Sequence, residues 1–147
     1  MCTTPGIGKV LGLVLLYEID NSARFPEVGN FLSYSRLVRP ERESAGKKKG
    51  SGGKKIGNAH LRWAFAEIAC LFLRRSERGK RWKQRQEKKH GSGKALGILA
   101  ARLARSVFHM IRKQEAFDED RFWGGQVQVA EPAPRTQKAT KARKKAS

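Results

Sequence analysis

Two stretches of the chain place apolar residues at the spacing of a helix that is buried along one face. The first begins after Asn58, a residue that favours a helix N-terminus, and the second lies in the last third of the chain. We expect the two apolar stripes to pack against each other and to form the core. Their members are Leu61, Ala64, Phe65, Ile68, Leu71 and Phe72 in the first stripe, and Leu96, Leu99, Leu103, Val107, Met110 and Ile111 in the second.

The other segments favour further helices joined by turns, and strand signals are weak throughout. "TTPGIGK" predicts a turn before an apolar helix over residues 9–19, and Pro26 suits the first turn of a short second helix. The polar stretch from Glu77 to about His90 is also expected to be helical, and "FDEDRFW" to fold back onto the domain. The sequence therefore predicts an all-α domain over residues 1–123, followed by a disordered basic tail over residues 124–147.

The chain carries a large excess of positive charge. It holds 32 Lys and Arg residues against 13 Asp and Glu residues, a formal net charge of +19. Such a charge opposes compaction and is typical of proteins that bind a polyanion. Nucleic acid is the leading candidate partner, an anionic lipid surface the second, and a surface that merely keeps the protein in solution the third.

Membrane insertion and metal binding find little support in the sequence. The apolar run after Lys9 is shorter than the roughly 20 residues that cross a bilayer, and no signal-peptide cleavage pattern follows it, so we expect a cytoplasmic protein. Cys2 and Cys70 do not stand at metal-ligand spacing from a histidine. Cys70 falls in the apolar part of its helix, where we expect a buried, unreactive thiol. Ala95 follows the "GSGK" motif where a phosphate-binding loop needs a hydroxyl, so nucleotide hydrolysis is not expected.

A run rich in glycine and lysine, residues 37–57, precedes the first apolar stripe. Glycines let backbone amides approach phosphates, and lysines supply the charge that attracts them. A flexible linker is the alternative, although the run is long for a compact domain. The nucleic-acid contacts predicted within the run are Gly46, Lys47, Lys48, Lys49, Lys54 and Lys55.

The turn at Gly6–Lys9 and the serine Ser44 each have two interpretations. Gly6, Gly8 and Lys9 resemble the hairpin of a helix-hairpin-helix element, in which backbone N–H groups bind a phosphate, but a plain turn packed on the core fits equally well. Ser44 heads the cationic run. A serine is a weak nucleophile that needs an activating base or metal, and spacing identifies no partner beyond the nearby Glu41, Glu43 and His60. Spacing alone therefore favours an ordinary loop serine at Ser44.

Four segments together resemble a known family. They are "TTPGIGKVLGLVLLYEI", "RFPEVGNFLSY", "RLVRPERESAGKKKGSGGKKIGNAHLRWAFAEIA" and "QEKKHGSGKALGILAARLAR". They are similar to the C-terminal domain of the DEDD-type insertion-sequence transposases (insertion sequence 110/116/902), the bridge-RNA recombinases of bacterial mobile elements. The resemblance covers about residues 4–123. Its most specific part is the string formed by Ser44, Gly46, Gly57, Asn58, Leu61 and Arg62.

This resemblance implies a role in DNA transposition. Ser44 would attack DNA and form a transient phosphoserine link during strand exchange, while Asn58 and Arg62 would contact nucleic acid. The implied partners are DNA, a guide (bridge) RNA and further copies of the full-length enzyme, in association with the nucleoid. Magnesium is expected on carboxylates of an N-terminal nuclease-like domain, and none within this chain. We expect that domain to be missing, so that this truncated transposase binds DNA without efficient recombination. A basic nucleic-acid-binding protein without enzymatic activity, or a transposase remnant, is the alternative.

Overall fold

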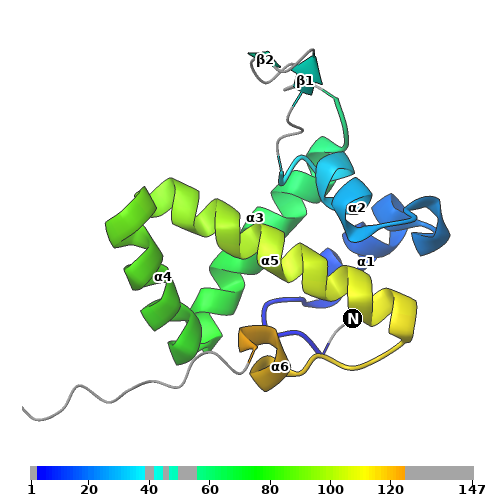
Figure 1. The fold of residues 1–147 in the computed structure, drawn as a ribbon. Coiled ribbons are helices and arrows are strands. Elements are labelled where there is room, and N and C mark those ends of the chain that lie inside the picture. Colours follow the sequence, from blue (N-terminus) through cyan, green and yellow to red (C-terminus); the bar gives the residue numbers. More distant parts are fainter. Residues whose placement is uncertain (1–2, 39–41, 45–46, 50–55, 125–147) are drawn as a thin grey trace, which may run out of the picture.

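The computed structural model describes residues 3–38, 42–44, 47–49 and 56–124 of the chain, and within them helices predominate (Figure 1). The expected all-α class is confirmed, and the one departure from it is a short antiparallel ribbon. In chain order the elements are α1 (Lys9–Ile19), the 3-10 turn η1 (Ser22–Arg24), α2 (Val28–Tyr34), β1 (Arg42–Ser44), β2 (Lys47–Lys49), α3 (Ala59–Arg75), α4 (Glu77–His90), α5 (Ser92–Lys113) and α6 (Glu119–Trp123). The tail predicted over 124–147 lies outside the described residues from residue 125 onward.

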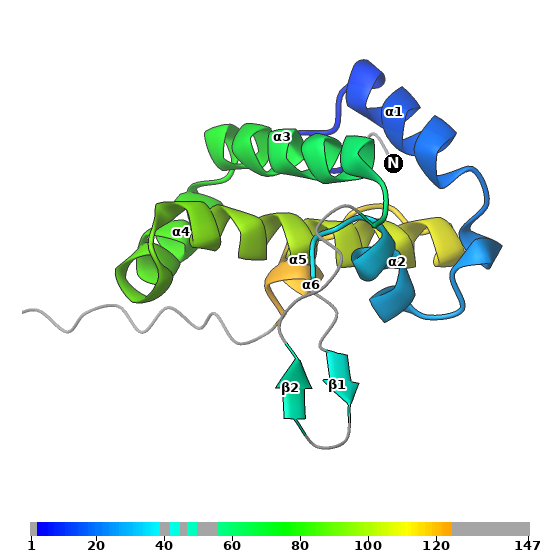
Figure 2. The ribbon, with the colours of Figure 1, turned by 90° about the horizontal axis from the view of Figure 1, so that it is seen from above.

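The predicted pairing of the two apolar stripes forms the core. Helix α3 contacts α1 and α5, and Figure 2 shows α3 between these two helices. Phe31 of α2 joins them, because its ring centroid lies 6.0 Å from that of Phe65 and 5.5 Å from that of Phe108. Most members of the stripes are fully buried, and Leu71, Leu96 and Ile111 are buried in part. The residues without exposed surface include Leu61, Ala64, Phe65, Ile68, Phe72, Leu99, Leu103 and Val107.

Two expectations about helical residues are wrong. Cys70 is exposed, because it belongs with Trp63 and Glu67 to the row of α3 that faces solvent. Pro26 does not lie in the first turn of α2, which begins at Val28 after Glu27 in an extended conformation. Phe25, directly before Pro26, is itself extended and buried, and its ring packs against Phe31 and Tyr34 of α2.

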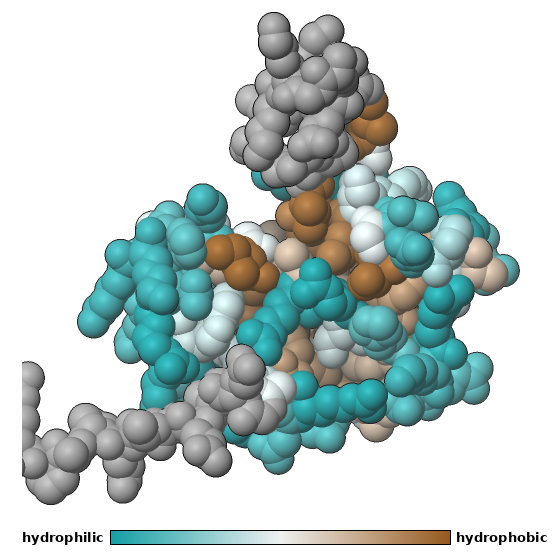
Figure 3. Space-filling view, viewed as in Figure 1, coloured by the Kyte–Doolittle hydropathy of each residue, from teal (hydrophilic) through white to brown (hydrophobic). Residues whose placement is uncertain are grey.

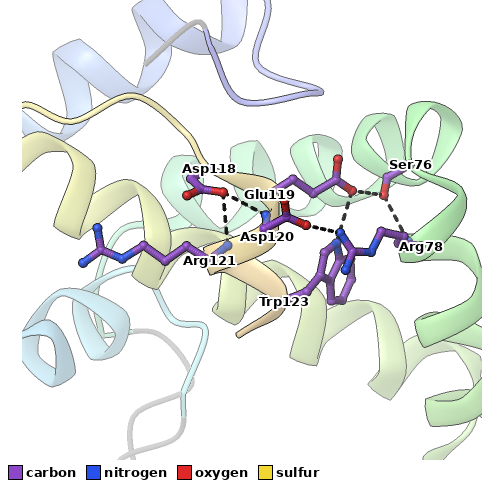
Figure 4. A network of polar contacts seen from close by, with 8 residues as sticks. Ser76, Arg78, Asp118, Glu119, Asp120, Arg121 and Trp123 are labelled. Atoms are coloured by element: carbon purple, nitrogen blue, oxygen red, sulfur yellow. Dashed lines mark hydrogen bonds and ion pairs between the residues drawn. The ribbon is translucent and has the colours of Figure 1, made fainter. Parts of the chain in front are cut away.

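The segment before residue 124 folds back as expected and closes the corner between α3 and α4 (Figure 4). Ser76 Oγ accepts a hydrogen bond from the Gly79 N–H at 3.0 Å, which caps α4, and donates one to Glu119 Oε1 at 2.7 Å. The same Glu119 oxygen accepts from Trp123 Nε1 at 3.2 Å. The ring of Trp123 packs against Phe72 of α3, so α6 is held by both polar and aromatic contacts.

Replacing Phe65 by alanine is expected to lower the free energy of unfolding by about 3–5 kcal/mol, because the ring is fully buried. The matched control is Trp63→Ala on the same helix, where 53 % of the residue is exposed and the loss should be about 1 kcal/mol or less. Urea titration followed by circular dichroism measures both. Equal losses in the two variants would show that Phe65 is not a core residue.

Candidate nucleic-acid interface

The Gly/Lys run contains the ribbon formed by β1 and β2, which the sequence did not predict. Ala45 and Gly46 separate the strands in the sequence, and neither this pair nor the charged residues on either side of it is a typical hairpin signal. The antiparallel register pairs Arg42 with Lys49, Glu43 with Lys48 and Ser44 with Lys47. The predicted nucleophile therefore stands at the end of a strand, directly across from a lysine. Gly46, Lys54 and Lys55 lie outside the part of the chain that the structure describes.

Gly57 holds the end of this run against the end of α2. Its φ of +102° lies in the left-handed region, and a Cβ atom there would come within 2.5 Å of the Tyr34 carbonyl oxygen, so only glycine fits. The backbone N–H of Asn58 donates to the same Tyr34 oxygen at 2.7 Å, and Arg36 Nε donates to the Gly57 carbonyl at 3.0 Å. The chain thus returns to the point at which it left α2. We call these contacts of Gly57 and Asn58 the Gly57–Asn58 clasp.

The side chain of Asn58 ties the clasp to two helices. Its Oδ1 accepts from the N–H groups of His60 at 2.8 Å and Leu61 at 3.0 Å, which confirms the predicted N-cap of α3. Its Nδ2 donates to Glu18 Oε2 of α1 at 2.5 Å. Both ends of the amide are therefore engaged within the domain. A contact between Asn58 and nucleic acid stays a prediction.

The turn before α1 is packed against α3. Gly6 has a φ of +97°, and a Cβ atom there would lie 2.8 Å from the Phe72 nitrogen and 2.9 Å from the Ile68 oxygen. This close approach favours the plain-turn interpretation for Gly6. Gly8 is the N-cap residue of α1 and is exposed, as is Lys9.

The sequence did not predict a groove along α5, although Arg102 and Arg105 lie outside the apolar stripe of this helix. It has a volume of about 1380 Å³, and its walls include Leu37 and Val38, which follow α2, and Phe122 of α6. Figure 3 shows hydrophilic surface over the middle of α5 on this face of the molecule. Arg62, a predicted nucleic-acid contact, is exposed and lines the groove together with the cations of α5 and α6. We call this feature the α5 groove; its basic residues are Arg62, Lys94, Arg102, Arg105, His109, Lys113 and Arg121.

The resemblance implies magnesium on a separate N-terminal domain, and that expectation stays a prediction. Among the described residues of this chain, no three His, Cys, Asp or Glu side chains are grouped as metal ligands. None of the helices in the described part of the chain has both the length and the apolar character needed to span a membrane.

Gly57→Ala is expected to destabilise the domain by about 1–3 kcal/mol, because the left-handed conformation is strained for alanine and its Cβ would clash with Tyr34. The run should also become more sensitive to limited proteolysis. Gly93→Ala is the matched control, because no atom lies within 4 Å of the added Cβ. Its free energy of unfolding should rise by about 0.5 kcal/mol, because alanine favours a helix more than glycine does. A Gly57→Ala variant that melts like wild type, with an unchanged cleavage rate, would contradict the role of the clasp.

The comparison with protein families connects these features to transposition. The model described as "Transposase IS116/IS110/IS902 family" matches residues 1–86. That segment includes the β1–β2 ribbon, the Gly57–Asn58 clasp and all of α3. A search of curated proteins finds no match. Since the family match covers more than half of the 147 residues, this chain belongs to the IS116/IS110/IS902 family of transposases.

Proposed function

We propose that this domain binds DNA and supplies Ser44 as the nucleophile of strand exchange. Membership of a transposase family supports transposition and recombination in general. The observation that carries the assignment to Ser44 is its register position at the end of β1, across from Lys47, in a run whose end is held by the clasp.

The proposed step is a phosphoryl transfer. The hydroxyl oxygen of Ser44 attacks the phosphorus of a DNA phosphodiester, an O–P bond to the serine forms, and the bond from phosphorus to one deoxyribose oxygen breaks. A base outside this domain accepts the serine proton, and the departing deoxyribose oxygen takes up a proton, so nothing is oxidised or reduced. Cations beside the phosphate stabilise the charge that develops on its oxygens. In the proposal, Lys47, Lys48 and Lys49 of β2 supply that charge.

The clasp contributes to this function by positioning. A run of about twenty residues that is free at one end would lose much conformational entropy on ordering around a phosphate. Because Asn58 bonds to both α1 and α2, the base of the run is already fixed before DNA arrives. Preorganisation of this kind lowers the cost of binding and of reaching a reactive geometry.

A basic nucleic-acid-binding protein without enzymatic activity is the second candidate. The α5 groove favours it, because a cationic surface needs no chemistry to hold a phosphate. The two candidates differ in one observable product, a covalent link between protein and DNA.

Binding to DNA is expected to be mainly electrostatic. If about six phosphates are contacted, the affinity should fall roughly a thousandfold between about 50 and 200 mM salt, because bound counterions are released when cations replace them. Fluorescence anisotropy with a labelled duplex measures this change. An affinity that stays constant over the same range would rule out phosphate contacts as the main source of binding.

Ser44→Ala is expected to leave melting and DNA affinity nearly unchanged and to abolish adduct formation. The assay combines this domain with a nuclease-like domain of the family, guide RNA, magnesium and target DNA, and detects the adduct as a denaturant-resistant shift on a gel. Ser51→Ala is the matched control, since Ser51 lies in the same run and should keep the adduct.

The outcomes separate the possible explanations. Loss of the adduct in Ser51→Ala but not in Ser44→Ala would transfer the nucleophile to Ser51. If no protein forms an adduct, a covalent fusion of the two domains tests whether the separated parts simply fail to assemble. A fusion that carries Ser44, binds DNA and still forms no adduct would contradict the catalytic role of Ser44 and leave the non-enzymatic candidate.

A further inference from the structure

We propose that the α5 groove is a second binding site, separate from the ribbon, for the sugar–phosphate backbone of a nucleic acid. This inference rests on the proposed function in one respect, namely that the protein binds nucleic acid. Most of the groove is built by α5 and α6, which lie beyond residues 1–86.

The charges in the groove are unbalanced. Its two acidic residues are already engaged, because Glu115 Oε2 pairs with Arg121 at 2.9 Å and Asp118 Oδ1 caps α6. The remaining cations have no carboxylate partner within the described residues. These unpaired groups are Arg62, Lys94, Arg102, Arg105 and Lys113, and they are available to bind an anionic ligand.

Arg102 is held in place at the centre of this charge. Its Nη2 donates to the Phe122 carbonyl at 2.7 Å, and its guanidinium carbon lies 5.2 Å from the ring centroid of Phe122 and 5.3 Å from that of Trp123. Burial, and then the charge of Arg105, lowers the pKa of Arg102, although a guanidinium remains protonated near neutral pH. A guanidinium has five N–H donors, so others remain for a phosphate. A phosphate beside both arginines would relieve their repulsion.

The spacing of the cations fits a chain of phosphates better than one isolated anion. Arg105, His109 and Lys113 follow one another at intervals of four residues along the groove. From Lys94 to Lys113 the helix rises about 28 Å, at roughly 1.5 Å per residue. That length corresponds to about eight nucleotide steps of roughly 3.4 Å. A recessed groove also suits a chain better than the flat surface of a bilayer.

The groove is continuous with the base of the ribbon-bearing run. Leu37 and Val38 line it, and β1 begins four residues after Val38. Figure 2 shows the ribbon on the α5 side of the helices, with α1 on the other side of α3. A nucleic acid in the groove would therefore lead toward the segment that carries Ser44.

The test compares two charge reversals that change the net charge equally. The two variants are Arg105→Glu and Arg85→Glu. Arg105 lines the groove, and Arg85 lies on the exposed surface of α4 outside it. Both arginines are exposed, so both variants should melt like wild type in circular dichroism. Binding is measured by anisotropy with DNA and RNA of one sequence, each single-stranded and duplex, about 20 nucleotides long so that it exceeds the groove.

Arg105→Glu is expected to weaken binding about tenfold or more and to reduce the salt slope by about one, as the loss of a phosphate contact does. Arg85→Glu should change the affinity less than about threefold. A loss confined to DNA or to RNA supports the site and identifies its ligand, and a loss in both assigns it to the shared backbone. Equal losses in the two variants would show that only net charge matters and would overturn the proposal.

The two proposals can fail separately. If Arg105→Glu binds like wild type while Ser44→Ala loses the adduct, the groove inference is wrong and the nucleophile assignment stands. If Arg105→Glu alone weakens binding and the Ser44-bearing fusion forms no adduct, the groove stands and the nucleophile assignment is wrong.

Discussion

The Tyr34 carbonyl oxygen accepts a hydrogen bond from the Asn58 N–H, and the placement of the cationic run depends on this contact. It closes the run at its base, next to the start of α3. Gly57 makes the approach possible because any Cβ at that position would meet the same oxygen. The Asn58 side chain then links this point to Glu18 of α1. One dipeptide therefore ends the run, caps α3 and joins α1 to α2.

The sequence predicted the parts of the fold that depend on local patterns. The stripes on α3 and α5 and the cap at Asn58 were correct because apolar spacing and capping are local properties. The prediction that Cys70 is buried was wrong because membership of an apolar stretch does not decide which face of a helix is covered. The role of Gly57 depends on an oxygen 23 residues earlier in the chain, and no local pattern carries that information. For the same reason the packing of Gly6 on α3 could not be separated from a phosphate-binding turn.

In the candidate site, too, some features follow from the sequence and others only from tertiary contacts. Family resemblance drew attention to Ser44 and the lysines around it, and the strand register adds the pairing with Lys47. The α5 groove needed several segments to be placed together: the residues after α2, parts of α3 and α4, the helix α5 and the segment that includes α6. Along the sequence Arg102 is only a cation off the apolar stripe. In the fold it is oriented by the Phe122 carbonyl and two aromatic rings, a contact made across 20 residues of chain.

The distribution of the acidic residues explains why so much positive charge remains available. Several of the acids act locally: Glu77 and Glu87 pair with lysines of α4, and Glu119 joins α6 to Ser76. The pKa of Glu77 is lowered mainly by its hydrogen bond from Lys80, and that of Glu87 mainly by its hydrogen bond from Lys83. Both carboxylates are therefore ionised at neutral pH, and their ion pairs lie within α4. They do not neutralise the cations of the groove. With a net charge of +19, self-repulsion works against the folded state, and a bound polyanion reduces that repulsion. By mass action, a ligand that binds only the folded domain also stabilises it, so binding and folding are coupled through the same charges.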